Sequence, residues 1–427
     1  MTAAVLTIGT ELLRGRIVNT NAAWISQRLT ELGIDVVYQA TVGDHLDEIV
    51  DVLQRAGAVS KVVIVTGGLG PTQDDLARES LAELTDRPLE EDPEAVAHLK
   101  AFFARRGYNF TGNNVKQATR PRGAELLENV CGTAPGVYLE HEGVVYIAVP
   151  GPPTEMHEMM ERHALPRILG FLGEPTGHRL LKRLRLCDVG ESSCAQILED
   201  VMRPDANPLV CSYASPGEVV LEITARAETE AEAEAMLAAR DAEIRERLPG
   251  NVYATGDDGM EAALGLALRE QGKTITTAES CTGGLIASRI TDVSGASEYF
   301  LQGIVSYSND AKMRLLGVPA ELLAEHGAVS GPVARAMVEG AREVAGADFA
   351  IAVTGIAGPT GGTDEKPVGL VYIAVGDESG AVVEEYTWPG TRYQFKQRVS
   401  QTALNMARKR VLGAAPEEDK PKPPIRI

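Results

Sequence analysis

The first 85 residues alternate apolar runs with amphipathic stretches, and this alternation limits the folds open to the chain. The apolar runs predict buried strands at 3–8, 34–42 and 62–65. The amphipathic stretches predict intervening helices at 22–32, 46–55 and 75–84. Such an alternation is typical of a doubly wound α/β domain built on a parallel sheet. Ligands of these sheets bind beyond the carboxyl ends of the strands.

Each predicted strand is followed by a polar or glycine-rich loop. Glu11 follows the first strand, Asp44 the second, and the segment 66–75 the third. Each carboxylate could be a helix cap or a solvated group. Because the three loops converge at one sheet edge, we predict a divalent-cation site (Mg²⁺, Mn²⁺ or Co²⁺) formed by Glu11, Asp44 and Asp75, with Asp74 beside it. The amides of Gly67, Gly68 and Gly70 could bind the oxygens of the same pyrophosphate.

The sequence divides into three folded parts. Residues 1–171 form the α/β domain, and residues 172–250, called the middle module here, predict a β-α-β-β-α arrangement with one solvated sheet face. Residues 251–258 predict a linker rich in Gly and Asp. A second α/β domain is predicted at 259–414. The segment 415–427 is rich in Pro and charge, which predicts a disordered tail.

Composition narrows the possible partners and location. The formal net charge of -19 argues against nucleic-acid binding, which depends on clustered Lys and Arg. The five cysteines form no Cys-x-x-Cys pair, so neither a disulfide framework nor a zinc ribbon is indicated. With no signal peptide or apolar run of spanning length in view, we expect a cytoplasmic protein.

The run 277–284, Thr-Ala-Glu-Ser-Cys-Thr-Gly-Gly, carries the strongest chemical signal in the second α/β domain. It places Ser280 between an apolar strand and an amphipathic helix, where helix N-terminal amides could face developing negative charge. Ser280 could act as a nucleophile or simply cap the helix. Cys281 is a rival nucleophile, although a lone Cys is more often packed in a core.

Elimination favours Lys312 as the base for Ser280. From Met260 onward the only histidine is His326, which has no acidic partner at a suggestive spacing. Lys312 beside Tyr307 could lose its proton when desolvated, although most lysines are solvated. Thr354 could supply an orienting hydroxyl or cap its strand. Arg392 could bind a phosphate or lie at the surface.

The carboxy-terminal motifs resemble the nicotinamide mononucleotide deamidase family. The resemblance rests on segments 278–284, 307–312, 327–330, 354–359 and 366–369, and covers about the last 165 residues. It implies hydrolysis of the carboxamide of nicotinamide mononucleotide, with no cofactor. Ser280 would be the nucleophile, Lys312 the base, and Tyr307 and Thr354 supporting groups. Substrate contacts would come from Thr282, Gly283, Gly284, Gly355, Gly358 and Arg392.

The amino-terminal half resembles the molybdopterin-binding domain family, in the branch found in competence/damage-inducible protein A (CinA) proteins. That branch implies metal-dependent cleavage of ADP-ribose, with Asn113 and Lys116 as further candidate substrate contacts. Gly9-Thr10-Glu11 stands where many relatives carry Gly-Asp-Glu, so one acidic ligand is missing. The middle module resembles the KH-like domain of the same proteins.

These observations predict a bifunctional hydrolase of pyridine nucleotides that forms a homodimer. Two alternatives stay open: a nucleotide-binding sensor in competence or DNA damage, and a molybdopterin-handling enzyme. The set Ser280, Tyr307 and Lys312 favours the hydrolase, because a pure binding protein needs no activated serine.

Overall fold

The computed structural model describes residues 1–107, 109–173 and 177–413, so the predicted tail at 415–427 lies outside the described residues. The chain separates into two compact units. The first comprises Met1–Arg179 with Ala227–Glu230, and the second comprises Leu180–Arg226 with the chain from Ala231 onward. Each unit is described by itself below.

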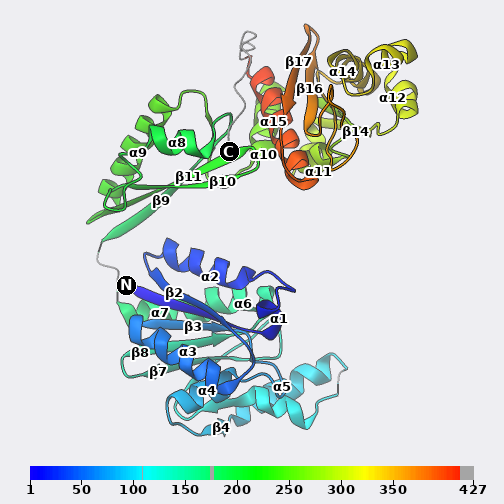
Figure 1. Ribbon diagram of the computed structural model, residues 1–427. Helices are drawn as coiled ribbons and strands as arrows, with labels where there is room; N and C mark the ends of the chain where they lie inside the picture. Colours follow the sequence, from blue (N-terminus) through cyan, green and yellow to red (C-terminus); the bar gives the residue numbers. More distant parts are fainter. Residues whose placement is uncertain (108, 174–176, 414–427) are drawn as a thin grey trace. The chain divides into compact units, whose positions relative to one another are not determined.

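A six-stranded mixed sheet forms the centre of the first unit, in the order β2-β1-β3-β8-β7-β6 (Figure 1). Four strands are parallel: β2 (Asp35–Val42), β1 (Thr2–Ile8), β3 (Val62–Thr66) and β8 (Val144–Val149). The three strands predicted from the sequence are parallel, as expected, and the sheet is extended at one edge by β7 (Gly136–His141), which pairs antiparallel with both β8 and β6 (Glu125–Leu127). The two-residue turn Glu142-Gly143 joins β7 to β8, and so short a connection permits only an antiparallel pair.

Helices cover both faces of this sheet, as the doubly wound prediction requires. Ala3 and Val5 of β1 face α2 (Thr20–Glu31), α6 (Pro153–Met159) and α7 (Leu165–Leu172). Ala4 and Leu6 alternate with them and face α3 (Leu46–Val59) and α4 (Ala77–Leu84). The remaining elements are α1 (Thr10–Leu13), β4 (Leu89–Glu91), α5 (Pro93–Arg105), η1 (Gly112–Ala118), β5 (Thr119–Pro121) and η2 (Met160–Ala164).

The middle module contains one strand more than the sequence predicts. Its sheet has the order β10-β11-β9-β12, with β10 (Leu209–Ser215), β11 (Glu218–Ala227), β9 (His178–Leu186) and β12 (Val252–Thr255). Helices α8 (Glu191–Ile197) and α9 (Glu230–Arg247) belong to the same module. Strand β12 lies where a linker is predicted, and it pairs antiparallel with β9. Tyr253 explains the difference, because its side chain is buried in the hydrophobic core that the module shares with the following domain.

The carboxy-terminal domain also has a mixed sheet, in the order β14-β13-β15-β16-β17. Strands β14 (Phe300–Val305), β13 (Ile275–Glu279) and β15 (Phe349–Gly355) are parallel, whereas β16 (Leu370–Asp377) pairs antiparallel with both β15 and β17 (Gly380–Thr387). One face packs against α12 (Asn309–Leu316), α13 (Ala320–His326) and α14 (Gly331–Ala345). The other packs against α10 (Met260–Gln271), α11 (Leu285–Thr291), η3 (Ala296–Glu298) and α15 (Arg392–Val411).

Helix α15 joins the middle module to the carboxy-terminal sheet. Asn405 and Lys409 each donate to Oδ2 of Asp188, at 2.9 and 2.7 Å. Cys187 and Tyr253 lie in the same hydrophobic cluster as Ala403 of α15. The two parts of the second unit are therefore held together by both apolar and charged contacts.

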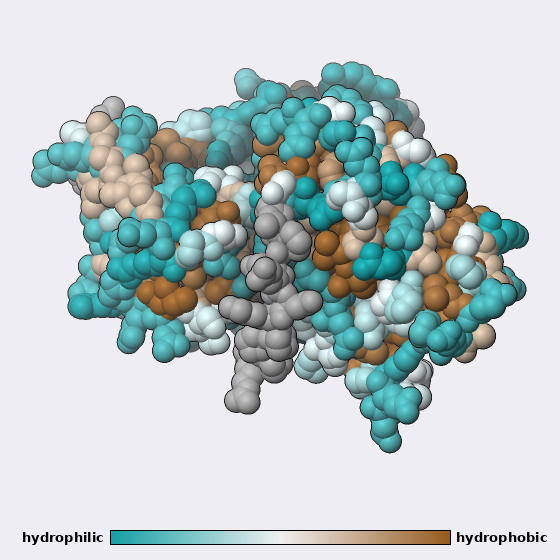
Figure 2. All heavy atoms as spheres, turned by 90° about the horizontal axis from the view of Figure 1, so that it is seen from above, coloured by the Kyte–Doolittle hydropathy of each residue, from teal (hydrophilic) through white to brown (hydrophobic). Residues whose placement is uncertain are grey.

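Hydrophilic side chains dominate the face drawn in Figure 2, with smaller apolar areas between them. Among the described residues, no helix combines the length and the apolar character needed to span a bilayer.

Candidate active sites

Ser280 and Lys312 meet at the carboxyl end of strand β13. The Ser280 amide donates to the Val353 carbonyl at 3.1 Å, which fixes the start of the turn against β15. Lys312 Nζ lies 3.0 Å from Ser280 Oγ. Ser280 is 9% exposed and Lys312 is 1% exposed. Two residues that are 32 positions apart in the sequence thus form a buried polar pair.

The surroundings of Lys312 favour a neutral amine. Burial lowers the pKa of Lys312, because a desolvated ammonium loses its hydration. Nζ also donates to the carbonyls of Ser306 at 2.8 Å and Tyr307 at 3.4 Å. A neutral amine has two N–H bonds and one lone pair. With two protons directed to these carbonyls, the lone pair is left to accept the Ser280 hydroxyl proton, which is the geometry of a general base.

Glu279 holds the turn that presents Ser280. Its carboxylate is 1% exposed and accepts from the amides of Gly284 at 3.0 Å, Ile286 at 3.0 Å and Ala287 at 2.8 Å. These are the free amides at the start of α11. Glu279 therefore occupies these three amides, which are not available to a reacting oxyanion.

Cys281 is packed rather than activated. Its side chain is buried, and burial raises the pKa of the Cys281 thiol to about 12. Since the thiolate is the nucleophilic form, this position disfavours Cys281 as the attacking group. The side chain belongs to the hydrophobic cluster formed with α10 and α15.

Arg392 connects three loops beside the serine. At the start of α15, its guanidinium donates to the Gly358 carbonyl and to the Tyr307 hydroxyl, each at 3.1 Å. The Tyr307 side chain is 62% exposed, while its carbonyl lies in the buried Lys312 contact. Tyr307 thus links the buried pair to a solvent-facing cation, a location suited to the charged end of a substrate.

Thr354 tethers a neighbouring loop. Its hydroxyl, 1% exposed, donates to the Ala328 carbonyl at 2.7 Å. Lys366 fixes the same loop by donating to the carbonyls of His326 at 2.6 Å and Val329 at 2.8 Å. In the sequence, Lys366 is visible only as the first residue of the 366–369 motif. Both side chains act on backbone carbonyls, so they shape the site through the 327–330 loop.

The other carboxy-terminal residues predicted to contact the substrate are four glycines and one threonine, and the glycines shape the backbone around the site. Gly283 and Gly284 have φ of 63° and 95°, values that favour glycine in the turn after Ser280. Gly355 and Gly358 lie against Val371 and Val368, where a Cβ would come within 2.9 and 2.5 Å of those side chains. Thr282 is fully buried, and its hydroxyl has no hydrogen-bond partner among the described residues.

In the first unit, Asp44 and Asp75 each hold a loop through one oxygen. Asp44 Oδ2 accepts from the Thr10 amide at 3.0 Å and from its hydroxyl at 2.6 Å. Asp75 Oδ2 accepts from the amide and hydroxyl of Thr72, the former at 2.8 Å. Thr10 therefore supplies a donor to Asp44 at the position where an acidic ligand is missing. All of these contacts use Oδ2, so Oδ1 of each carboxylate takes part in none of them. Mg²⁺ usually binds only one or two carboxylates, together with substrate oxygens and water.

The glycine loop packs closely against the end of β1. A Cβ at Gly67 would lie 2.4 Å from the Ile8 carbonyl, and one at Gly70 would lie 2.4 Å from Asp75. Gly68 approaches the Ala77 amide at the start of α4. Lys116 Nζ reaches this loop, donating to the Thr72 carbonyl at 2.9 Å and pairing with Glu79 at 3.0 Å. Asn113 is exposed on the same short helix, η1.

The predicted metal ligands do not form a closed cage. Across residues 1–107, 109–173 and 177–413, no three His, Cys, Asp or Glu side chains are grouped for metal binding. Glu11 is exposed and lies over Gly9, where a Cβ would come within 2.5 Å of Oε1. The donor set fits a hard cation only if the substrate supplies further oxygens.

Arg78 is a site residue that sequence reasoning missed. It is fully buried and donates to the carbonyls of Leu69 and Pro135, each at 2.9 Å. Burial lowers the pKa of Arg78 to about 10. Its position offered a signal, because Arg78 lies three residues before Leu81 on the apolar face of a predicted helix. An arginine there indicates a buried polar role.

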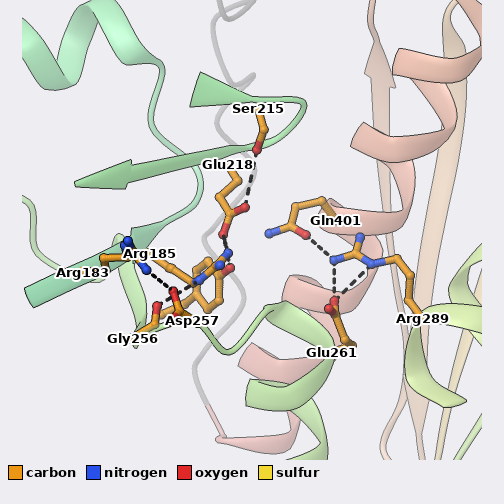
Figure 3. A network of polar contacts seen from close by, with 10 residues as sticks. Arg183, Arg185, Ser215, Glu218, Gly256, Asp257, Glu261, Arg289 and Gln401 are labelled. Carbon is orange, nitrogen blue, oxygen red and sulfur yellow. Dashed lines mark hydrogen bonds and ion pairs between the residues drawn. The ribbon is translucent and has the colours of Figure 1, made fainter. Parts of the chain in front are cut away.

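Acidic partners neutralise the basic strand of the middle module. Lys182 pairs with Asp241, and Arg183 pairs with Glu222. Figure 3 shows two further pairs, Arg183 with Asp257 and Arg185 with Glu218. Nucleic-acid affinity needs Lys and Arg that are free to contact phosphates. The contacts of this strand give no support to a nucleic-acid partner.

Comparisons with protein families follow the same three-part division. Residues 4–170 match the probable molybdopterin binding domain, residues 181–254 the damage-inducible protein CinA KH domain, and residues 257–411 the CinA C-terminal domain. The chain is thus a three-domain α/β protein of the kind that joins these modules.

Relatives of full length identify the family. The chain is 46% identical over 423 residues to a putative competence-damage inducible protein of Symbiobacterium thermophilum, covering 97% of this chain and 99% of that protein. It is 44% identical to one of Moorella thermoacetica, covering 95% and 97%. The chain belongs to the CinA family.

Solved structures cover single parts of the chain. The crystal structure of the competence/damage inducible protein CihA from Agrobacterium tumefaciens is 42% identical and covers 34% of this chain and 90% of its own, with a TM-score of 0.34. That of the protein CinA from Thermoplasma acidophilum is 37% identical and covers 39% and 97%, with a TM-score of 0.37.

The Glu279 cap predicts a large stability effect. Glu279→Ala removes the acceptor of three amides, and we expect the carboxy-terminal domain to lose about 3 kcal/mol of unfolding free energy. Urea unfolding, followed by Trp388 fluorescence in a Trp24→Phe background, measures this, because the chain has two tryptophans, one in each unit. Glu298→Ala, at a mostly exposed carboxylate in the same domain, is the control. Equal stability of the two variants would contradict the structural role of Glu279.

Proposed function

We propose that the carboxy-terminal domain hydrolyses the carboxamide of nicotinamide mononucleotide to nicotinate mononucleotide and ammonia. The observation that carries the proposal is the 3.0 Å contact between Ser280 Oγ and the buried amine of Lys312. The family resemblance supplies the substrate. A protein that only bound a nucleotide would have no use for a desolvated lysine on a serine.

The reaction would proceed through an acyl-enzyme. Lys312 accepts the Ser280 proton while Oγ attacks the carboxamide carbon. The tetrahedral intermediate collapses when Lys312 returns the proton to the amide nitrogen, so that the C–N bond breaks and ammonia leaves. Water then attacks the ester, with Lys312 again as base, and releases the carboxylate and Ser280. Arg392, near the exposed hydroxyl of Tyr307, would bind the phosphate of the substrate.

Substitution of the two neighbouring nucleophiles tests this assignment. Ser280→Ala should lower the turnover number for ammonia release by about three orders of magnitude or more. Cys281→Ala should keep most of the activity, since the buried thiol takes no part. Excess chelator should leave the rate unchanged, because serine and amine chemistry needs no metal. An inactive Cys281→Ala together with an active Ser280→Ala would reverse the assignment.

The pH dependence of the same reaction tests the base. The neutral form of Lys312 is the active one, so kcat/KM should rise with pH and level off above the Lys312 pKa. Because burial lowers that pKa, the plateau should begin below the ordinary lysine value of 10.5. Lys312→Arg should be inactive throughout, since a guanidinium keeps its proton. A flat wild-type profile, or activity in Lys312→Arg, would exclude Lys312 as the base.

We further propose that the amino-terminal domain cleaves the pyrophosphate of ADP-ribose, giving AMP and ribose 5-phosphate, with a divalent cation. The carboxyl ends of β1, β2 and β3 place Glu11, Asp44 and the glycine loop at adjacent positions of the sheet. Asp44 and Asp75 would each coordinate the ion through one carboxylate oxygen. Such an ion would neutralise the charge of the pyrophosphate, which a chain of net charge -19 would otherwise repel.

Removal of single carboxylate charges tests the metal site. Asp44→Asn and Asp75→Asn keep the size of the side chain and should abolish AMP formation, measured with added Mg²⁺, Mn²⁺ or Co²⁺. Asp51→Asn is the matched control, because Asp51 is exposed on α3, where it pairs with Arg55. Ammonia release should be unaffected in all three. A silent wild type with every metal, or full activity in both Asn variants, would contradict the proposal.

A further inference from the structure

The β10–β11 hairpin of the middle module packs directly on helix α15. The turn Pro216-Gly217 joins the two strands, and Gly217 has a φ of 86°, which favours glycine. A Cβ at Gly217 would lie 3.1 Å from the Cβ of Gln401 and 3.6 Å from the Cα of Arg398, both on α15. Because Gly217 has no side chain, the turn can lie against the helix. Neither reaction proposed above uses this contact.

Gln401 connects the hairpin to helix α11. Figure 3 shows Gln401 between Glu218 of the hairpin and Arg289 of α11. Its Oε1 accepts a hydrogen bond from Arg289 Nη2 at 2.6 Å. Its Nε2 is buried and has no hydrogen-bond partner among the described residues. On the side of the hairpin, the position of Gln401 therefore depends on packing against Gly217 rather than on a hydrogen bond.

Arg289 attaches the end of α11 to two other helices. Besides Gln401, its guanidinium donates to Ser400 Oγ of α15 at 2.8 Å and pairs with Glu261 of α10 at 2.6 Å. The amides at the start of α11 are bound by the Glu279 carboxylate. Helix α11 has seven residues, and a helix so short is not stable by itself. The contacts at its two ends therefore set its position.

Ser280 lies directly after Glu279, in the turn that leads into α11. A shift of this helix would move the serine relative to Lys312, and proton transfer needs the two groups within hydrogen-bond reach. We infer that the β10–β11 hairpin positions Ser280, acting through Gln401 and Arg289. The middle module thereby contributes to catalysis without touching the substrate. The catalytic part of this inference rests on the proposed deamidase, whereas the positioning of the turn does not.

Hydrogen exchange of the full-length protein tests the positioning without any reaction. Gly217→Leu puts a side chain between the turn and α15, so amides of residues 281–291 should exchange about tenfold faster, because their local opening becomes easier. Peptides from α13, on the other face of the sheet, should exchange as in the wild type. Gly250→Leu is the matched control, because Gly250 has a similar φ of 77° and a Cβ there would meet no atom within 4 Å.

Gln401→Met guards against misfolding of the first variant, because it leaves the hairpin turn unchanged. The methionine keeps a side chain of similar length but removes the acceptor of Arg289, and it should give the same faster exchange at 281–291. Unchanged exchange at 281–291 in both variants, or an increase spread evenly over the domain in both, would overturn the inference.

The rate of ammonia release tests the catalytic part. In both variants kcat should fall about tenfold, since the serine and its base are no longer held together. The pH midpoint of kcat/KM should move up toward 10.5, because a displaced turn admits water to the Lys312 amine and reduces the lowering of its pKa by burial. Loss of folded protein would lower the rate at every pH without moving the midpoint.

The two measurements separate this inference from the proposed function. A wild type that releases no ammonia from nicotinamide mononucleotide would refute the deamidase, and the exchange at 281–291 would still decide whether the hairpin positions the turn. Wild-type kcat and an unmoved pH midpoint in both variants, in a protein that does release ammonia, would overturn the catalytic role of the middle module.

Discussion

The amine of Lys312 lies inside the carboxy-terminal domain, and its burial organises the elements around it. Its hydrogen bonds go to the end of β13, through Ser280, and to the end of β14, through two carbonyls. Within the described part of the chain, no carboxylate forms an ion pair with this amine. A lysine that reached solvent or met an acid would keep its proton. Whether Lys312 is neutral and can accept the Ser280 proton therefore depends on how well the surrounding helices exclude water.

Local pattern was sufficient for the main strands and helices. The strands at 3–8, 34–42 and 62–65 form as predicted, because apolar runs alternate with amphipathic helices; β1 and β3 are buried on both faces, whereas β2, at the edge of the sheet, is mostly only partly buried. The antiparallel edges could not be read in the same way, since strand direction depends on the connection. Strand β12 was missed because four residues between glycine-rich turns look like a linker until Tyr253 is placed in a core.

The candidate sites were partly visible in the sequence. Elimination of other bases indicated Lys312, and the structure brings its amine to Ser280. The structural roles of Glu279 and Thr354 could not be predicted from the sequence, because both side chains bind backbone groups whose positions depend on the tertiary fold. Arg78 shows the general limit: the sequence can mark a charged residue on an apolar face, but its two carbonyl partners are 9 and 57 residues away.

Helix α15 carries a geometrical constraint across the second unit. Arg392 begins the helix beside Tyr307, whereas Asn405 and Lys409 are bound to Asp188 of the middle module. At 1.5 Å per residue, the two points of attachment are about 20–25 Å apart along one rigid rod. An α-helix turns by about 100° per residue, so the length of α15 between them sets the direction in which Arg392 points. One residue inserted into that stretch would rotate the arginine away from its loops. The number of residues between Arg392 and the contacts with Asp188 must therefore stay the same.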